Sequence, residues 1–296
     1  TTFSNVRLNN SGTVDVQSGS LTVTGNVFNN NGTARTEAGT LTVSGGGTGG
    51  GTFEAASPGL VSFTGGTTTL TNGARLMGTG TNRVNGGTLT VQDSVTGERV
   101  EVVSGTMNGT GTLTLTNRFE WSGGTLGGTG TLTLLAGGVG TISSGVSKLL
   151  SGGWVLNNEG TLVWTGLGAI TIWQGTWNNS GVLEAQSNAT LNDSDASGAV
   201  FNNTGTLRKT TATGTTTFSN VSLNNSGTMD VRTGTISISG NYSPAAASMH
   251  RFAVGGYVAG TDFGRMSVSG TLTLTGQLDL MLTNSFAPTN GATFGI

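Results

Sequence analysis

The sequence predicts an all-β protein, a right-handed parallel β-helix (solenoid) in which the chain winds into stacked coils. Three observations support this prediction: a composition typical of strands, a short phrase that recurs along the chain, and apolar residues that alternate with polar ones. The right hand follows from the general preference for right-handed crossovers between parallel strands. Solenoids bury their apolar residues only by stacking successive coils, so the repeat is the unit that has to be understood.

Composition favours strands over helices and over disorder. The 296 residues include 53 glycines but only 3 prolines, and 9% of the residues are charged, against about 25% in ordinary soluble proteins. Disordered chains are poor in β-branched residues and rich in charge, which is the reverse of this composition. Valine, leucine and isoleucine interleaved with threonine are typical of strands.

Charge and cysteine content argue against several kinds of partner. The net charge is −2 and the pI is about 5.3, so there is no basic field for nucleic acid. No apolar run approaches the ~20 residues that a membrane-spanning helix needs, and Thr1–Asn10 shows no signal-peptide pattern. Without cysteine, a disulfide framework or a thiolate metal site is impossible. We therefore expect no nucleic-acid partner and no membrane span in this chain.

One short phrase built on Asn-Asn-x-Gly recurs along the chain. Its copies are Leu8–Thr13, Phe28–Thr33, Leu156–Thr161, Trp177–Val182, Phe201–Thr206 and Leu223–Thr228. The phrases and their weaker relatives are mostly 19 to 24 residues apart. In addition, residues 1–26 align without gaps to residues 216–241, with 17 of 26 positions identical. A repeat of this length is the signature of a solenoid.

Each repeat contains three short runs in which apolar and polar residues alternate. In the first repeat the runs centre on Arg7, Asp15 and Thr22, each standing between two apolar residues. Such alternation places one side of a strand in the core and the other in water. Three strands of three to five residues then make one coil, which stacks on the next at the ~4.8 Å spacing of paired strands.

The Asn-Asn-x-Gly phrase falls between two strands and predicts a corner of the coil. We expect its asparagines to tolerate, and its glycine to adopt, the left-handed backbone conformation that a sharp bend needs. Stacked asparagine side chains are also expected to hydrogen-bond from coil to coil, as amide ladders do in stacked sheets. The predicted corner residues are Asn9, Asn10, Gly12, Asn29, Asn30, Gly32, Asn157, Asn158, Gly160, Asn178, Asn179, Gly181, Asn202, Asn203, Gly205, Asn224, Asn225 and Gly227.

Outward charges of opposite sign follow one another on successive coils. Asp15 is followed by Arg35, and Glu184 by Arg208 and Asp230. Stacking would place these side chains next to each other as cross-strand ion pairs, each contributing ~0.2 to 1 kcal/mol. We interpret them as structural residues that set the register of the coils.

The remaining ionisable residues do not form a pattern that indicates catalysis. Asp193 and Asp195 are expected in a solvated loop, because a calcium site needs six to eight oxygen ligands and the pair does not recur. His250 is the single histidine, and nothing in the sequence near it suggests a serine–histidine–carboxylate triad. We expect no enzyme activity, no cofactor and no metal.

Two outward patterns leave room for ligand binding. In the coil register, four of the five tryptophans point inward, and only Trp173 points outward as a possible contact for a sugar. Threonine pairs such as Thr112/Thr114 and Thr131/Thr133 would form a flat ladder if they stack, resembling the ice-binding face of some solenoid antifreeze proteins. The alternative is that threonine is simply a favourable outward residue in strands.

Three segments of the repeats are similar in pattern to repeats of known proteins. They are GTVDVQSGSLTV at Gly12–Val23, WSGGTLGGTGTLTL at Trp121–Leu134 and FNNTGTLRK at Phe201–Lys209. They resemble the repeats of large bacterial surface β-helix proteins, namely autotransporter passengers and filamentous-haemagglutinin-like adhesins. The segment from Asn241 onward is similar to the terminal module of such arrays. The resemblance implies an exported protein, since members of this group are typically exported and many adhere to surfaces or to each other.

Residues 1–240 are accordingly predicted to form a β-helix of about ten coils. Residues 241–296 are predicted to form a less regular, partly antiparallel C-terminal module that continues or caps it. The predicted function is that of a structural extracellular or cell-surface protein: a stalk, an adhesin or a filament subunit. Both ends interrupt a coil, and open coil ends present unpaired backbone, so we expect self-association end to end. The alternative is a binding module for glycans or ice that uses an outward threonine or aromatic face.

Overall fold

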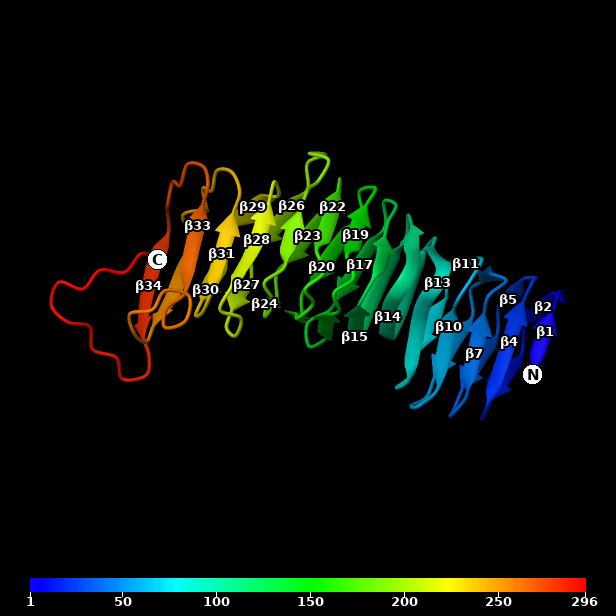
Figure 1. Ribbon diagram of the computed structural model, residues 1–296. Coiled ribbons are helices and arrows are strands. Elements are labelled where there is room, and N and C mark those ends of the chain that lie inside the picture. The colour runs from blue at the N-terminus through cyan, green and yellow to red at the C-terminus, as the bar shows by residue number, and fades with distance from the viewer. The chain divides into compact units, whose positions relative to one another are not determined.

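The computed structural model describes residues 1–296 and contains strands and turns but no helix. Strands make up 55% of the chain and form a parallel β-solenoid of about 12 turns (Figure 1). The predicted fold class is therefore confirmed. The chain has no helix with the length and apolar character that crossing a lipid bilayer would require.

The chain divides into two compact units. Unit 1 comprises Thr1–Thr141 and Lys148–Leu156, and unit 2 comprises Ile142–Ser147 and Asn157–Ile296. Strands β18 (Val139–Ile142) and β20 (Val155–Asn158) contribute residues to both units. The boundary predicted at residue 241 lies inside unit 2 and remains a prediction.

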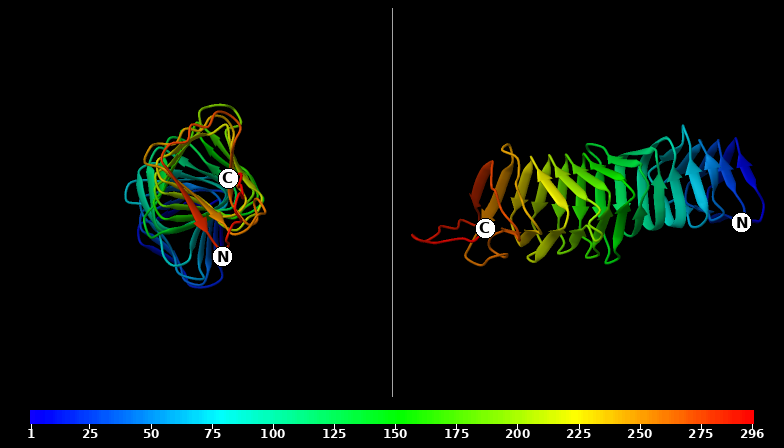
Figure 2. Two further views of the ribbon diagram at one scale, coloured as in Figure 1. Left: turned by 90° about the vertical axis from the view of Figure 1, so that its left-hand side faces the viewer. Right: turned by 90° about the horizontal axis from the view of Figure 1, so that it is seen from above.

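In unit 1 the strands of successive turns stack in three columns (Figure 2). One column contains β4, β7 and β10, a second contains β8 and β11, and a third contains β3, β6 and β9. The strands of this unit are β1 (Thr2–Ser4), β2 (Leu8–Asn10), β3 (Thr13–Val16), β4 (Ser20–Thr24), β5 (Phe28–Asn30), β6 (Thr33–Thr36), β7 (Thr40–Val43), β8 (Gly47–Gly49), β9 (Thr52–Ala55), β10 (Leu60–Phe63), β11 (Thr67–Leu70), β12 (Arg75–Met77), β13 (Thr81–Val91), β14 (Ser94–Gly109), β15 (Thr112–Trp121), β16 (Gly124–Leu126), β17 (Thr131–Leu134) and β19 (Lys148–Ser151).

Unit 2 has the same three-column arrangement. One column contains β24, β27 and β30, a second contains β25, β28 and β31, and a third contains β23, β26 and β29. The strands of this unit are β21 (Thr161–Trp164), β22 (Ile170–Trp173), β23 (Thr176–Asn179), β24 (Val182–Ala185), β25 (Thr190–Asn192), β26 (Val200–Asn203), β27 (Thr206–Lys209), β28 (Thr215–Ser219), β29 (Ser222–Asn225), β30 (Thr228–Val231), β31 (Thr235–Ile238), β32 (Met249–Val254), β33 (Arg265–Val268) and β34 (Gln277–Leu282).

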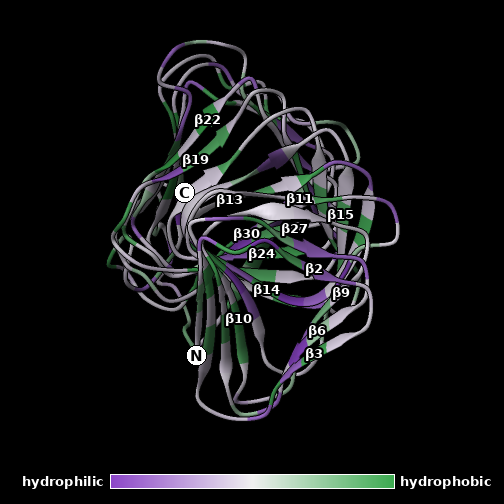
Figure 3. Cartoon of the chain, turned by 90° about the vertical axis from the view of Figure 1, so that its right-hand side faces the viewer, coloured by the Kyte–Doolittle hydropathy of each residue, from purple (hydrophilic) through white to green (hydrophobic).

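Because the strands pair in parallel and in register, equivalent residues of successive turns lie next to each other. Leu21 of β4 pairs with Leu41 of β7, which pairs in turn with Val61 of β10. Leu41 and Val61 are fully buried, whereas the residues between the apolar ones face outward. Figure 3 shows the resulting alternation of hydrophobic and hydrophilic residues along the strands. Because the side-chain period of a strand is two, this register is strongly specified by the sequence.

Three strands of unit 1 are longer than the sequence suggested. Strands β13, β14 and β15 have 11, 16 and 10 residues, where three to five were expected. These strands bend without losing their pairing, and the register shifts locally between Val84 and Asn85. Gly86 and Gly105 adopt positive φ angles of 104° and 79° within β13 and β14, which lets the backbone turn a corner inside a strand.

Large aromatic side chains fill the inside of the turns. Trp121, Trp154, Trp164 and Trp177 are all 0% exposed, as their place in the alternation predicted. In unit 2, Trp177 meets Phe201 edge to face with 5.3 Å between ring centroids, and Phe201 meets Phe218 in the same way at 5.2 Å. Edge-to-face packing of this kind adds ~0.5 to 1.5 kcal/mol per pair beyond simple burial.

The C-terminal segment continues the columns of unit 2. Strand β32 pairs in parallel with β30 and with β34, and β33 pairs in parallel with β31. The predicted antiparallel character is limited to one isolated bridge, between Val254 and Phe263. The irregularity lies instead in the long connections, because the Asn-Asn-x-Gly corner is absent after Asn241.

Candidate functional site: the asparagine corner

The two asparagines of each corner lie at the end of a strand and point to opposite sides of it. In β26, Asn203 is 1% exposed and faces the core, whereas Asn202 is half-buried and faces outward. Neighbouring turns repeat this arrangement in register, with Asn202 opposite Asn178 and Asn224. Because successive strand residues alternate between faces, two adjacent asparagines build two separate ladders, one inside and one outside.

The inner ladder is a chain of buried amides. In unit 2, Asn158 Nδ2 donates to Asn179 Oδ1, Asn179 to Asn203, and Asn203 to Asn225, each at 2.7 Å. The first three amides also donate to the backbone carbonyls of Val182, Thr206 and Thr228 at 2.9 to 3.0 Å. In unit 1, Asn10 donates to Asn30 at 2.7 Å. Burying an amide without a partner costs ~1 to 3 kcal/mol, so these bonds stabilise the stack.

The outer ladder runs in the opposite direction. Asn178 Nδ2 donates to Asn157 Oδ1 at 2.8 Å, Asn202 to Asn178 at 2.8 Å, and Asn224 to Asn202 at 2.9 Å. In unit 1, Asn29 donates to Asn9 at 2.8 Å. Each outer amide therefore donates to the preceding turn, whereas each inner amide donates to the following turn. The prediction that corner asparagines bond from turn to turn is confirmed for both ladders.

The reason given for the corner glycines is wrong. None of the corner asparagines or glycines adopts a positive φ angle. Close approach requires glycine instead at four of the six corners, namely Gly32, Gly181, Gly205 and Gly227. A Cβ at Gly205, for example, would lie 2.2 Å from the carbonyl oxygen of Gly181. At Gly227 the corresponding distance to the carbonyl oxygen of Gly205 is also 2.2 Å. At these corners the turns stack so tightly that no side chain fits between them, whereas a Cβ at Gly12, in the first corner, would have no atom within 4 Å.

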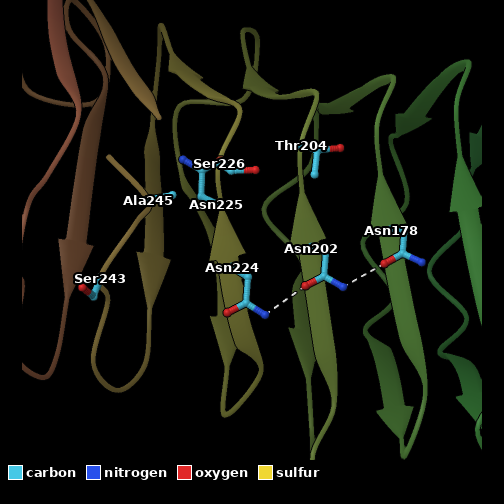
Figure 4. A pocket seen from close by; sticks show the side chains of 8 residues that line it. All are labelled: Asn178, Asn202, Thr204, Asn224, Asn225, Ser226, Ser243 and Ala245. Carbon is cyan, nitrogen blue, oxygen red and sulfur yellow. Dashed lines mark hydrogen bonds between the residues drawn. The ribbon is translucent and has the colours of Figure 1, made fainter. Parts of the chain in front are cut away.

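The outer asparagines line a groove in each unit. The groove of unit 2 has a volume of about 490 Å³ and is formed by Asn178, Asn202, Thr204, Asn224, Asn225, Ser226, Ser243 and Ala245 (Figure 4). That of unit 1 has a volume of about 400 Å³ and is formed by Asn9, Asn10, Ser11, Asn29, Asn31 and Thr48. Neither lining contains a charged residue. The two grooves occupy equivalent places in the repeat.

The predicted charge ladders are present. Asp15 Oδ2 accepts a hydrogen bond from Arg35 at 2.8 Å, and this bond lowers the pKa of Asp15. In unit 2, Arg208 lies between Glu184 at 2.8 Å and Asp230 at 3.1 Å. These pairs join successive turns, since Arg208 is in register with both carboxylates. Their geometry supports the interpretation of these residues as structural.

The expectation of a solvated loop is wrong for Asp193, which is only 2% exposed. Its carboxylate accepts hydrogen bonds from the backbone N–H groups of Ser197, Gly198 and Ala199 at 3.2, 2.9 and 3.0 Å. Burial opposes ionisation, but the bond from Ala199, the contact with Asp195 and the other backbone bonds lower the pKa of Asp193 to about 2. The carboxylate thus organises its own loop instead of facing water.

Unit 2 also buries the ionisable side chains of Lys209 and His250. Lys209 is 0% exposed, and its Nζ donates to Ser187 O at 2.9 Å and Thr216 Oγ1 at 3.0 Å. Burial lowers the pKa of Lys209 to about 8. His250 is also 0% exposed, and its Nε2 lies 2.9 Å from the hydroxyl of Tyr242. Sequence reasoning missed Lys209, although its inward place in the alternation of β27 was a signal for burial.

The predicted outward features lie on the outer face of the solenoid but are limited in extent. Trp173 is 40% exposed and its Nε1 donates to Ser194 Oγ at 2.9 Å, so its proposed contact with a ligand stays a prediction. Thr112 and Thr114 stack on Thr131 and Thr133. Arg75 stands in the same column two turns before Thr114, so the threonine ladder extends over only a few turns.

The fold and the two amide ladders define this chain as a β-solenoid with asparagine corners. No protein-family model, no characterised protein and no solved structure matches the chain. The site must therefore be understood from its own geometry.

Proposed function

We propose that this protein is a structural extracellular protein, a surface stalk, adhesin or filament subunit similar to autotransporter passengers and filamentous-haemagglutinin-like adhesins. The observation that supports this role is the pair of amide ladders that link turn to turn. From β23 to β29, each turn is attached to the next by backbone pairing, by an inner amide bond and by an outer amide bond. A stalk needs this kind of repeated attachment, because load applied to its ends must be borne by every turn.

The use of the ionisable side chains supports a role without catalysis. Asp193 organises a loop, Lys209 bonds to groups in the core, and Arg208 joins three turns. Groups with shifted pKa values are candidates for catalysis when they face a cleft. Here the buried Lys209 and Asp193 already have partners supplied by the chain. We propose a location outside the cell or on its surface, because the repeats resemble those of exported proteins, and the absence of cysteine is compatible with an oxidising exterior.

Force spectroscopy tests the mechanical proposal. The chain is tethered through its two ends and stretched, and unfolding is expected in steps of about one turn. A turn of 20 to 24 residues spans ~4.8 Å along the stack and ~65 to 85 Å when fully extended, so each step should lengthen the chain by ~60 to 80 Å. Extension without steps, at forces too small to distinguish the fold from a disordered chain, would contradict the role of a stalk. Antibody labelling of intact source cells tests the location, and signal found only after lysis would refute it.

Self-association end to end is part of this proposal. Strand β34 exposes Leu278, Leu280 and Leu282 at 51, 52 and 56%, although they are in register with core residues of β32. An exposed apolar strand edge is a template for pairing with another chain, and a second copy of this chain is the proposed partner. Sedimentation velocity should show concentration-dependent assembly that Leu280→Asp weakens. A monomer at all concentrations would contradict self-association.

A further inference from the structure

We propose that the groove at the outer asparagine ladder of unit 2 binds a neutral glycan. This inference rests on the proposed surface role, which it deepens by naming a binding site and a class of ligand. It differs from the predicted threonine or aromatic faces, because the groove lies at the asparagine corner.

The chemistry of the lining selects the ligand. Seven of the eight lining residues carry an amide or a hydroxyl group, and the eighth is Ala245. Anions are recognised by arginine or lysine, which are absent from this lining. Protein interfaces have an apolar and often aromatic centre, which is also absent. A ligand that offers many uncharged hydroxyl groups is therefore the best match.

The ladder leaves hydrogen-bonding groups unused toward the groove. An amide has two N–H donors and an oxygen with two lone pairs. Asn202 uses one N–H to reach Asn178 and one lone pair to accept from Asn224. One donor and one acceptor of this rung remain for a ligand. Because the turns repeat at ~4.8 Å, the next rung presents the same pair of groups one turn away.

The last rung provides an acceptor that the chain does not use. Asn224 donates to Asn202, but its Oδ1 accepts no hydrogen bond from the chain. The next turn has Ser243 and Ala245 beside the groove in place of another asparagine (Figure 4). In unit 1 the corresponding oxygen of Asn29 accepts from the backbone N–H of Thr48 at 3.1 Å. In the groove of unit 2 the Oδ1 of Asn224 is therefore available to a ligand, whereas in the groove of unit 1 the Oδ1 of Asn29 already accepts a hydrogen bond from the chain.

Hydroxyl groups form the opposite side of the groove. Thr204 and Ser226 occupy the third position of successive corners, and both side chains are exposed. Amides on one side and hydroxyls on the other repeat with the turns of the solenoid. A linear glycan, whose hydroxyl groups also repeat, can bond to successive turns. This match between two periodic chains is the physical basis of the proposal.

Calorimetry with defined oligosaccharides tests the inference. The probes are linear hexasaccharides of β-1,4-glucose, α-1,4-glucose and β-1,4-N-acetylglucosamine, with a heparin hexasaccharide as the anionic comparison. At least one neutral probe is expected to bind the full chain. Asn224→Ala should weaken binding by about 2- to 12-fold, the equivalent of one hydrogen bond of ~0.5 to 1.5 kcal/mol. Ser226→Trp should abolish binding by filling the groove without removing a ladder bond.

Asn192→Ala is the matched control, because Asn192 is also an outward asparagine at the end of a strand of unit 2 but lies outside the groove. It should leave the affinity unchanged. Thr204→Trp provides a second block if Ser226→Trp perturbs folding, as judged by hydrogen exchange. The inference is overturned if no neutral probe binds, if heparin binds more tightly than every neutral probe, or if the groove variants bind normally. Two results together would refute this inference but not the structural role. The chain would unfold turn by turn under load and be labelled on intact cells, and it would bind no sugar.

Discussion

Replacing Gly205 by alanine tests whether the corner glycines are selected by stacking or by backbone conformation. The new Cβ would lie 2.2 Å from the carbonyl oxygen of Gly181 and 2.5 Å from backbone atoms of Ser180. These are backbone atoms, so no side-chain rotation relieves the contact. The turn must move away from its neighbour, which weakens the hydrogen bonds from Gly205 N to Asn179 O at 2.9 Å and from Thr206 N to Gly181 O at 2.8 Å.

The expected cost combines two effects. Overpacking in a tightly packed core typically costs ~1 to 3 kcal/mol, and each weakened backbone hydrogen bond adds up to ~0.5 to 1.5 kcal/mol. A local destabilisation of ~2 to 4 kcal/mol corresponds to roughly 30- to 700-fold faster hydrogen exchange at this corner. Hydrogen exchange measured by mass spectrometry is the appropriate assay, because stability in repeat arrays is local and a single unfolding free energy is poorly defined.

Two further glycines provide matched controls for Gly205→Ala. Gly12 occupies the same place in its corner, but a Cβ there has no atom within 4 Å, so Gly12→Ala should leave exchange unchanged or slow it slightly. Gly19 also has open space but a φ of 70°, so Gly19→Ala should cost ~1 to 2 kcal/mol through conformation alone. The reasoning is refuted if Gly12→Ala is as costly as Gly205→Ala, or if Gly205→Ala is tolerated.

Three other predictions concern unit 2. Asn203→Ala should destabilise its corner by ~2 to 4 kcal/mol, because it removes three buried hydrogen bonds, namely those with Asn179, Asn225 and the carbonyl of Thr228. Asn202→Ala on the outer ladder should cost less than ~1.5 kcal/mol. Hydrogen exchange measures both effects. Burial lowers the pKa of Lys209 from 10.5 to about 8, so stability should rise as pH increases from about 8 to 10.5, and Lys209→Met should reduce this rise in guanidinium titrations. The pKa of Asp193 is held at about 2 against 3.8 in the absence of interactions, so its contribution should be lost as pH falls from about 4 to 2. Acid titration of Asp193→Asn should lack that loss, and an unchanged acid transition would contradict the role assigned to this carboxylate.

Much of the architecture could be predicted because its causes are periodic in the sequence. The alternation around Trp177 and Trp164 places these side chains inside, and both are fully buried. The repeat length brings Arg208 next to Asp230, and the two form an ion pair. Both conclusions require only that strands alternate with a period of two and that turns stack in register.

The candidate site could be predicted only in part. The sequence identifies the corner asparagines and their ladders, but it does not show that the outer ladder borders an open groove beside Ser243. That groove depends on where the long connection after β31 passes, and this connection has no repeated pattern. Asp193 was also misjudged, because its burial depends on a loop that folds back to present three N–H groups.

The sequence by itself therefore determined the three-strand repeat, the register and the apolar residues that face the core, since each follows from the repeat and from the alternation of apolar residues. Only the tertiary structure decided why the corner glycines are needed, where the groove lies and which oxygen of the outer ladder stays open. These properties depend on distances between turns, such as the 2.2 Å that a Cβ at Gly205 would leave to Gly181. These distances are set only when the turns stack on each other, so they cannot be read from local sequence patterns.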